Sequence, residues 1–150
     1  MTQEEKELLI KDLSARLPYS VIVRHADQFV DNDGNETGKF WYKRGYLCDI
    51  TTLDDMTTTI IESEGSDEEG YEHICFLERS LPFLRPISSM TEEEIKELSE
   101  IDMKRLIFSS RHLTWHLDGE VIDYLNKKMF DWRRLIPNGL ALEAPEGMYK

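Results

Sequence analysis

The chain is poor in cysteine and has no long apolar run. Two cysteines among 150 residues are too few for a disulfide framework. We therefore expect Cys48 and Cys75, each in apolar and strand-like surroundings, to be buried free thiols. No stretch approaches the roughly 18 consecutive apolar residues of a membrane-spanning helix. The first residues are acidic, whereas a signal peptide begins with basic ones. These features predict a cytoplasmic protein without membrane contact.

Motifs that carry common enzyme chemistry are also missing from the sequence. It contains no Gly-x-Ser-x-Gly nucleophile elbow, no phosphate-binding glycine loop and no dinucleotide fingerprint. Asp54, Asp55 and the carboxylates at residues 67–69 fall in polar neighbourhoods, although a tuned acid or base needs burial. We therefore predict no catalytic residue and no cofactor, and the sequence leans away from an enzyme without excluding one.

Basic residues are scarce, and the net charge is −12. Residues 51–100 hold nearly half of the 30 acidic residues and few basic ones. A chain this acidic repels the phosphate backbone, so direct binding to nucleic acid is not expected. The acidic loop at residues 64–70 is a candidate docking face for a basic protein partner through Asp67, Glu68 and Glu69. Simple solubility explains the same acidity.

Hydrophobic residues make up 40% of the chain, enough for one packed core, and residues 1–150 are expected to form a single domain. Thr2 and Glu5 have the form of a capping box before an apolar helical repeat. Pro82 and Pro86 interrupt the pattern after the last strand. The expected fold class is α+β, an antiparallel sheet of about three to five strands with an N-terminal helix and C-terminal helices packed on it. The expected helices cover residues 3–16, 91–101 and 118–128, and the expected strands cover residues 19–25, 39–48, 57–62 and 71–77.

The segment after residue 129 combines a helix cap, large apolar residues and a stop signal. Asp131 is placed to cap a short helical turn over residues 132–136, and Gly139 is available for the left-handed conformation that ends such a turn. These local signals agree with one another, so we expect Trp132 to lie mostly in the core. Arg133 and Arg134 are expected to point to water.

Two patterns resemble metal sites and fail closer tests. His112 and His116 stand four residues apart, which suits a shared zinc ion on a helix but not on a strand, where they are about 13 Å apart. Alternating apolar residues favour a strand there, so no metal ligand is predicted. Residues 31–36 resemble a calcium loop, but aligning Gly34 with the loop glycine puts Phe29 and Phe40 at ligand positions.

The most distinctive sequence motifs of the chain lie in residues 81–149. The segments are LRPISSMTEEE at 84–94, DYLN at 123–126, FDWRRLI at 130–136 and GLALEAPEGMY at 139–149. They resemble a group of small uncharacterised proteins encoded in gut Bacteroidales genomes, often in phage or mobile-element neighbourhoods. The resemblance covers about half of the chain and brings no activity, cofactor or binding residue.

Three functions follow as hypotheses from the sequence. The first is a non-enzymatic accessory or protein-interaction protein of phage or mobile-element type. The second is a small enzyme or metal-binding protein that uses His112 and His116. The third is an acidic decoy that occupies a nucleic-acid-binding protein.

Overall fold

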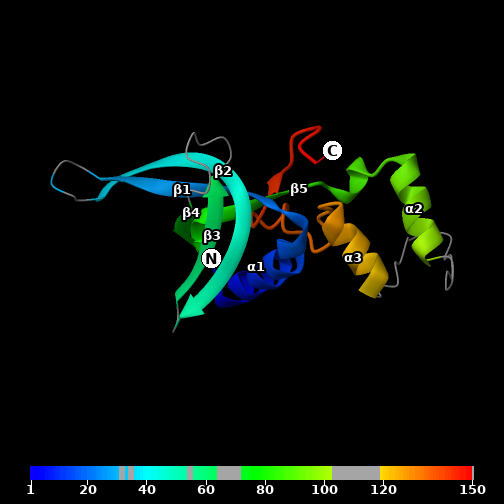
Figure 1. The fold of residues 1–150 in the computed structure, drawn as a ribbon, viewed down its shortest axis with the longest axis horizontal. Helices are drawn as coiled ribbons and strands as arrows, with labels where there is room; N and C mark the ends of the chain where they lie inside the picture. The colour runs from blue at the N-terminus through cyan, green and yellow to red at the C-terminus, as the bar shows by residue number, and fades with distance from the viewer. Residues whose placement is uncertain (31–32, 34–35, 54–55, 64–71, 103–118, 150) are drawn as a thin grey trace.

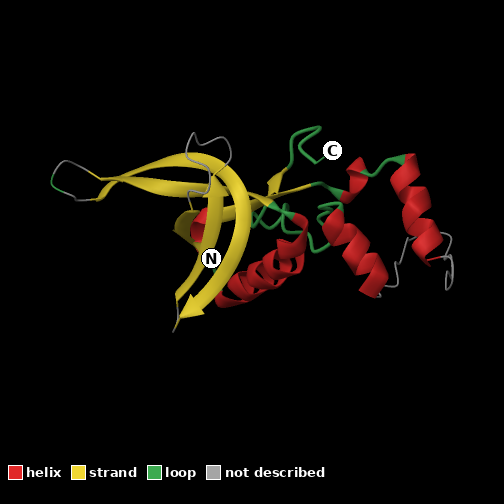
Figure 2. Cartoon of the chain, in the orientation of Figure 1, coloured by secondary structure: helices red, strands yellow, loops and turns green. Residues whose placement is uncertain are grey.

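A computed structural model of the chain describes all residues except 31–32, 34–35, 54–55, 64–71, 103–118 and 150. An N-terminal helix, a curved sheet and two further helices form the molecule (Figure 1), so the expected α+β class is confirmed. Figure 2 shows the helices gathered below and to one side of the sheet. The helices are α1 (Gln3–Arg16), α2 (Glu92–Asp102) and α3 (Gly119–Lys127), with short 3-10 turns η1 (Leu17–Tyr19), η2 (Leu77–Arg79) and η3 (Ile87–Ser89). The strands are β1 (Ile22–Val30), β2 (Glu36–Leu53), β3 (Met56–Ser63), β4 (Glu72–Phe76), β5 (Ser80–Leu84) and β6 (Leu142–Glu143).

The sheet is larger than the sequence predicted and is mixed. Its six strands follow the order β4-β3-β2-β1-β5-β6, with every pair antiparallel except β5 and β6. The expectation of a purely antiparallel sheet of three to five strands was therefore wrong. Pro82 hid β5, although it pairs with Val23 of β1. The chain after residue 141 then returns along β5, where the Ala144 amide donates to the Leu84 carbonyl at 2.8 Å.

The first helix forms as its sequence predicts. The Glu5 amide donates to the Thr2 hydroxyl at 3.2 Å, and the Thr2 amide donates to the Glu5 carboxylate at 2.7 Å. This reciprocal pair satisfies two amides that an uncapped helix leaves without partners. Leu9 and Leu13, one turn apart, are fully buried. The helix therefore lies with this face against the sheet.

Two apolar clusters hold the molecule together. The larger one lies between α1 and the inner face of the sheet and contains Leu9, Leu13, Val21, Val23, Leu47, Ile61, Cys75, Leu77 and Leu84, among others. The smaller one joins α2 and α3 to Phe130 through Leu98, Val121 and Leu125. The second capping box, Thr91 with Glu94, is present at the start of α2.

The segment after Met129 is fixed as a series of turns. The Asp131 carboxylate accepts hydrogen bonds from the amides of Leu135 at 2.6 Å and Ile136 at 2.9 Å, as its predicted capping role requires. Gly139 has the expected left-handed backbone, with φ of 71°. Residues 132–136 are turns and not the helical turn expected. Leu135 and Leu140 are buried against the larger cluster.

Candidate functional site

The distal part of the β1–β2 hairpin extends beyond the rest of the sheet (Figure 1). The strand β1 pairs with β5 only from Val23 to His25, and β2 pairs with β3 only from Gly45 onward. We name residues 26–30 and 36–44 the hairpin arm. Among the residues that the structure describes, they therefore pair only with each other. An isolated two-stranded ribbon is marginal by itself, so its stability depends on the sheet at its root.

Large apolar side chains lie on the outer face of the sheet, opposite α1. On the hairpin arm, Phe40 is 41% exposed and Tyr42 is 58% exposed. On β4, Ile74 is 72% exposed and Phe76 is 45% exposed. The pairs Ile60–Ile74 and Thr58–Phe76 place the β4 side chains on the same face of the sheet, away from the buried Cys75. We name these four side chains the outer apolar patch.

An arginine side chain lies over each of the three aromatic rings of the outer apolar patch. The Arg24 guanidinium is 4.7 Å from the centroid of the Tyr42 ring. The Arg79 guanidinium is 5.0 Å from the centroid of Phe40 and 5.4 Å from that of Phe76. These are cation–π distances. Arg79 therefore links the hairpin arm to β4 across the outer face.

A small groove lies at the root of the hairpin arm. Its volume is about 170 Å³, below the range of pockets that hold cofactors or drug-sized ligands. The residues that line it are apolar, aromatic and charged. Its lining residues are Arg24, Ala26, Phe40, Tyr42, Glu78, Arg79 and Leu81.

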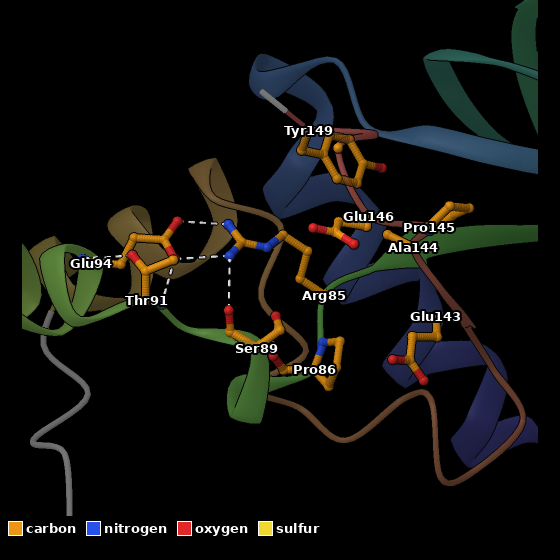
Figure 3. Close-up of a pocket in the computed structure, with 11 residues that line it drawn as sticks. Arg85, Pro86, Ser89, Thr91, Glu94, Glu143, Ala144, Pro145, Glu146 and Tyr149 are labelled. Atoms are coloured by element: carbon orange, nitrogen blue, oxygen red, sulfur yellow. Dashed lines mark hydrogen bonds and ion pairs between the residues drawn. The ribbon is translucent and has the colours of Figure 1, made fainter.

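A larger cavity, of about 450 Å³, lies where β5 meets α2 and the C-terminal segment (Figure 3). Arg85 reaches the Glu94 carboxylate with both terminal nitrogens, at 2.7 and 2.8 Å, and donates to the Ser89 carbonyl at 3.3 Å. These hydrogen bonds from Arg85 lower the pKa of Glu94 from 4.5 to about 2. Glu94 is therefore ionised at neutral pH and committed to the arginine.

Tyr149 lines the same cavity and is also committed to the fold. Its hydroxyl donates to the Phe83 carbonyl at 2.8 Å and accepts from the Ile22 amide at 3.1 Å. Burial raises the pKa of this phenol to about 12, so it stays protonated at neutral pH. The paired polar groups of the cavity act as a joint between β5, α2 and the C-terminal segment. Glu143 and Glu146 add exposed carboxylates at its rim.

A buried ion cluster joins α1 to the C-terminal turns. Asp12 and Arg16 are fully buried, and Arg16 reaches the two Asp12 oxygens at 2.7 and 3.0 Å. A further Arg16 bond, of 2.8 Å, goes to the Phe130 carbonyl. Arg133 lies 3.3 Å from Asp12 and is only 13% exposed, so the expectation that it points to water was wrong. The buried Arg16 and the partly buried Arg133 share the Asp12 carboxylate here, and an unpaired buried charge would be costly.

Trp132 and Arg134 lie in the same C-terminal segment and differ in exposure. Trp132 is half-buried against the smaller apolar cluster, and its indole nitrogen donates to the Asn126 side chain at 2.9 Å. The Arg133 guanidinium stacks 3.9 Å from the indole centroid and covers part of it. Arg134 is exposed, as expected.

The two cysteines differ from each other. Cys75 is a buried free thiol, as predicted, and its sulfur lies 3.4 Å from Nδ1 of the buried His25. Cys48 is a free thiol but is exposed, so the prediction of its burial was wrong. Cys48 directly follows the buried Leu47, so the alternation of side chains along β2 turns it to the exposed face.

Other residues singled out from the sequence lie outside the described residues. These are the proposed partner-binding residues Asp67, Glu68 and Glu69, the histidines His112 and His116, and most of the loop at residues 31–36. Their roles stay predictions. Within the described ranges, no group of three or more His, Cys, Asp or Glu side chains is arranged to hold a metal ion.

The hairpin arm carries a signal that the sequence reading missed. Residues 39–46 read KFWYKRGY, four aromatic and three basic residues out of eight, with no acid. Such interleaving of rings and cations is typical of binding surfaces rather than of cores. The sequence pattern predicts only a strand here, because the net charge of the whole chain masks a local excess of positive charge.

Comparisons of the chain with protein-family models, with curated proteins and with solved structures found no match. Across the part of the chain that the structure describes, no helix is both long enough and apolar enough to cross a membrane.

Proposed function

We propose that this chain is a non-enzymatic protein-interaction protein, and that a protein partner docks on the outer face of the hairpin arm. The observation that carries the proposal is the outer apolar patch, which combines Phe40 and Tyr42 of the arm with Ile74 and Phe76 of β4. Exposed patches of large apolar side chains mark interaction surfaces, whereas scattered single ones need no explanation.

The composition of this surface supports a protein as the partner. Aromatic residues and arginines are enriched where proteins bind one another, and they supply most of the binding energy there. Arg24 and Arg79 lie over the rings of the patch. Rings held in this way lose little side-chain freedom on binding, which lowers the entropic cost of association.

The setting of this interaction belongs to the same proposal. We place it in the cytoplasm, because free thiols at Cys48 and Cys75 suit a reducing compartment. A phage or mobile-element origin is supported only by the sequence motifs of residues 81–149. An accessory role in such a setting requires binding and no chemistry, which agrees with a larger cavity whose main polar groups are paired to one another.

Site-specific photo-crosslinking tests the proposal. A photoreactive phenylalanine analogue replaces Tyr42 on the outer face, and in a matched control it replaces the exposed Glu120 of α3. In cells that produce the protein we expect one discrete adduct from position 42 and none from position 120. Adding Phe76→Ser should abolish the adduct, because the patch is then interrupted.

Two results would contradict the proposed docking face. Equal crosslinking at positions 42 and 120 would show that contacts with the arm are non-specific. An adduct whose mass equals two copies of this chain, formed also by the purified protein, would replace the partner by self-association.

A further inference from the structure

The volume of the groove at the root of the hairpin arm limits the size of the group that can bind in it. Its volume of about 170 Å³ fits one apolar side chain and is too small for a cofactor. Its lining includes the apolar side chains of Ala26 and Leu81 and the aromatic rings of Phe40 and Tyr42. A single buried anchor residue in such a pocket is how many interfaces gain most of their affinity.

The arginines that line the groove indicate which charge the residues flanking that anchor carry. Arg24 and Arg79 line it, each stacked on a ring. A stacked guanidinium uses its flat face, so the N–H edge of Arg24 remains available to a carboxylate. Within the described residues, no carboxylate lies at ion-pair distance from Arg24. By contrast, Arg85 is fully paired with Glu94.

The surrounding charges decide between an acidic peptide and a nucleic acid. A nucleic acid carries one charge per nucleotide along its whole length. Beyond the groove it would meet the cross-strand pair Glu62–Glu72 on the outer face of β3 and β4, in a chain of net charge −12. A short peptide with a few carboxylates avoids this pair. Glu78, which lines the groove, lies 3.9 Å from the Lys6 ammonium, which offsets its charge.

We infer that the groove binds a short acidic peptide segment of the protein partner. An apolar side chain of that segment fills the groove, and a flanking carboxylate pairs with Arg24. This inference rests on the proposed function and adds the chemistry of the partner to it. Arg44, which is the cross-strand neighbour of Arg24, adds positive charge on the same face of the hairpin arm.

Selection from a random peptide library on the full chain tests the inference without a known partner. We expect enrichment of peptides in which Asp or Glu flanks a large apolar residue. A selected peptide, labelled for fluorescence anisotropy, should bind about tenfold more weakly to Arg24→Gln and to Tyr42→Ser. Arg134→Gln, the same charge change at an exposed turn, should leave its affinity unchanged. Replacing the peptide carboxylates by amides should weaken binding by a similar factor.

Three results would overturn the inference. These are no enrichment at all, enrichment of peptides without carboxylates, and binding of an oligothymidylate that is tighter than that of the selected peptide and is lost in Arg24→Gln. The last result would assign the surface to single-stranded nucleic acid, whose bases stack on aromatic residues. If crosslinking at position 42 persists while acidic peptides do not bind, the proposed docking face is retained and only the inferred acidic peptide is rejected.

Discussion

The joint between β5 and α2 and the root of the hairpin arm both place an arginine over an aromatic ring. At the joint, Arg85 lies 4.3 Å from the Phe130 centroid and is held by Glu94 from the other side. At the arm, Arg24 lies 4.7 Å from the Tyr42 centroid, with no described carboxylate at ion-pair distance. Phe130 is fully buried, whereas Tyr42 is mostly exposed.

This difference separates structural contacts from contacts available to a partner. A stacked arginine that is also paired with a carboxylate has its hydrogen-bond donors occupied, and both contacts stabilise the fold. A stacked arginine without one is pre-positioned, so a carboxylate that arrives from outside gains a charge-assisted bond at a low entropic cost. The predictions below test this contrast by removing charges and contacts from each region.

The largest effect is expected in the buried ion cluster. Asp12→Ala leaves Arg16 and Arg133 buried without their carboxylate and should lower the free energy of unfolding by about 3–5 kcal/mol. Urea unfolding followed by circular dichroism measures this. The control, Glu120→Ala at an exposed position, should stay within about 0.5 kcal/mol of the parent. Equal effects of the two variants would remove the structural role assigned to the cluster.

The next effect is expected at the root of the hairpin arm. A Cβ on Gly45 would lie 2.4 Å from the Glu62 carbonyl oxygen and 2.5 Å from a methyl carbon of Ile61. Gly45→Ala should therefore force the strands apart and cost about 2–3 kcal/mol in thermal or urea unfolding. Gly119→Ala is the matched control, because no atom lies within 4 Å of its added carbon. Normal stability of Gly45→Ala would mean that β2 and β3 are less closely packed there.

A smaller effect is expected at the joint, and it depends on pH. Glu94→Gln should cost about 1–2 kcal/mol at neutral pH, because it removes a charge-assisted pair with Arg85. The folded-state pKa of Glu94 lies below its ordinary value, so its contribution is present above pH 4.5 and is lost as the pH falls toward about 2. Urea unfolding at a series of pH values should therefore show the gap between parent and variant closing over that window. A constant gap would place the loss elsewhere.

The smallest effect on stability is expected on the hairpin arm. Arg24→Gln and Tyr42→Ser remove exposed contacts and should change the free energy of unfolding by less than about 0.5 kcal/mol. The same variants should lose the partner adduct or the selected peptide. A loss of stability beyond about 1 kcal/mol would show that the stacked pair supports the fold, and the contrast with Arg85 would then disappear.

Local signals predicted the elements of the fold well. The capping boxes at Thr2 and Thr91, the turn ended by Gly139 and the β1–β2 hairpin all follow from short-range chemistry that the sequence shows directly. The sheet size did not follow. The strand β5 contains Pro82, and β6 is two residues long, so neither has a pattern of its own. Both exist because tertiary pairing brings the C-terminal segment to β1 and β5.

The candidate site was harder to predict than the fold. The residues 39–46 show their rings and cations in the sequence, but only the pairing register shows that they extend past the sheet and stay exposed. Arg79 is far from this run in sequence and reaches Phe40 only because the sheet curves. In the same way, nothing local shows that Arg133 would turn toward Asp12, because that contact joins opposite ends of the chain.

The lysines of the hairpin arm have a consequence for solubility. Outside its root, no strand in the described part of the chain pairs with the outer backbone edge of either strand of the arm, and such edges are templates for aggregation when they are long and apolar. Lys39 and Lys43 are exposed on β2 along one of these edges. Two arms that meet edge to edge would bring their lysines together, and the charges would repel. The arm can therefore keep its aromatic rings in water while resisting assembly into intermolecular sheets.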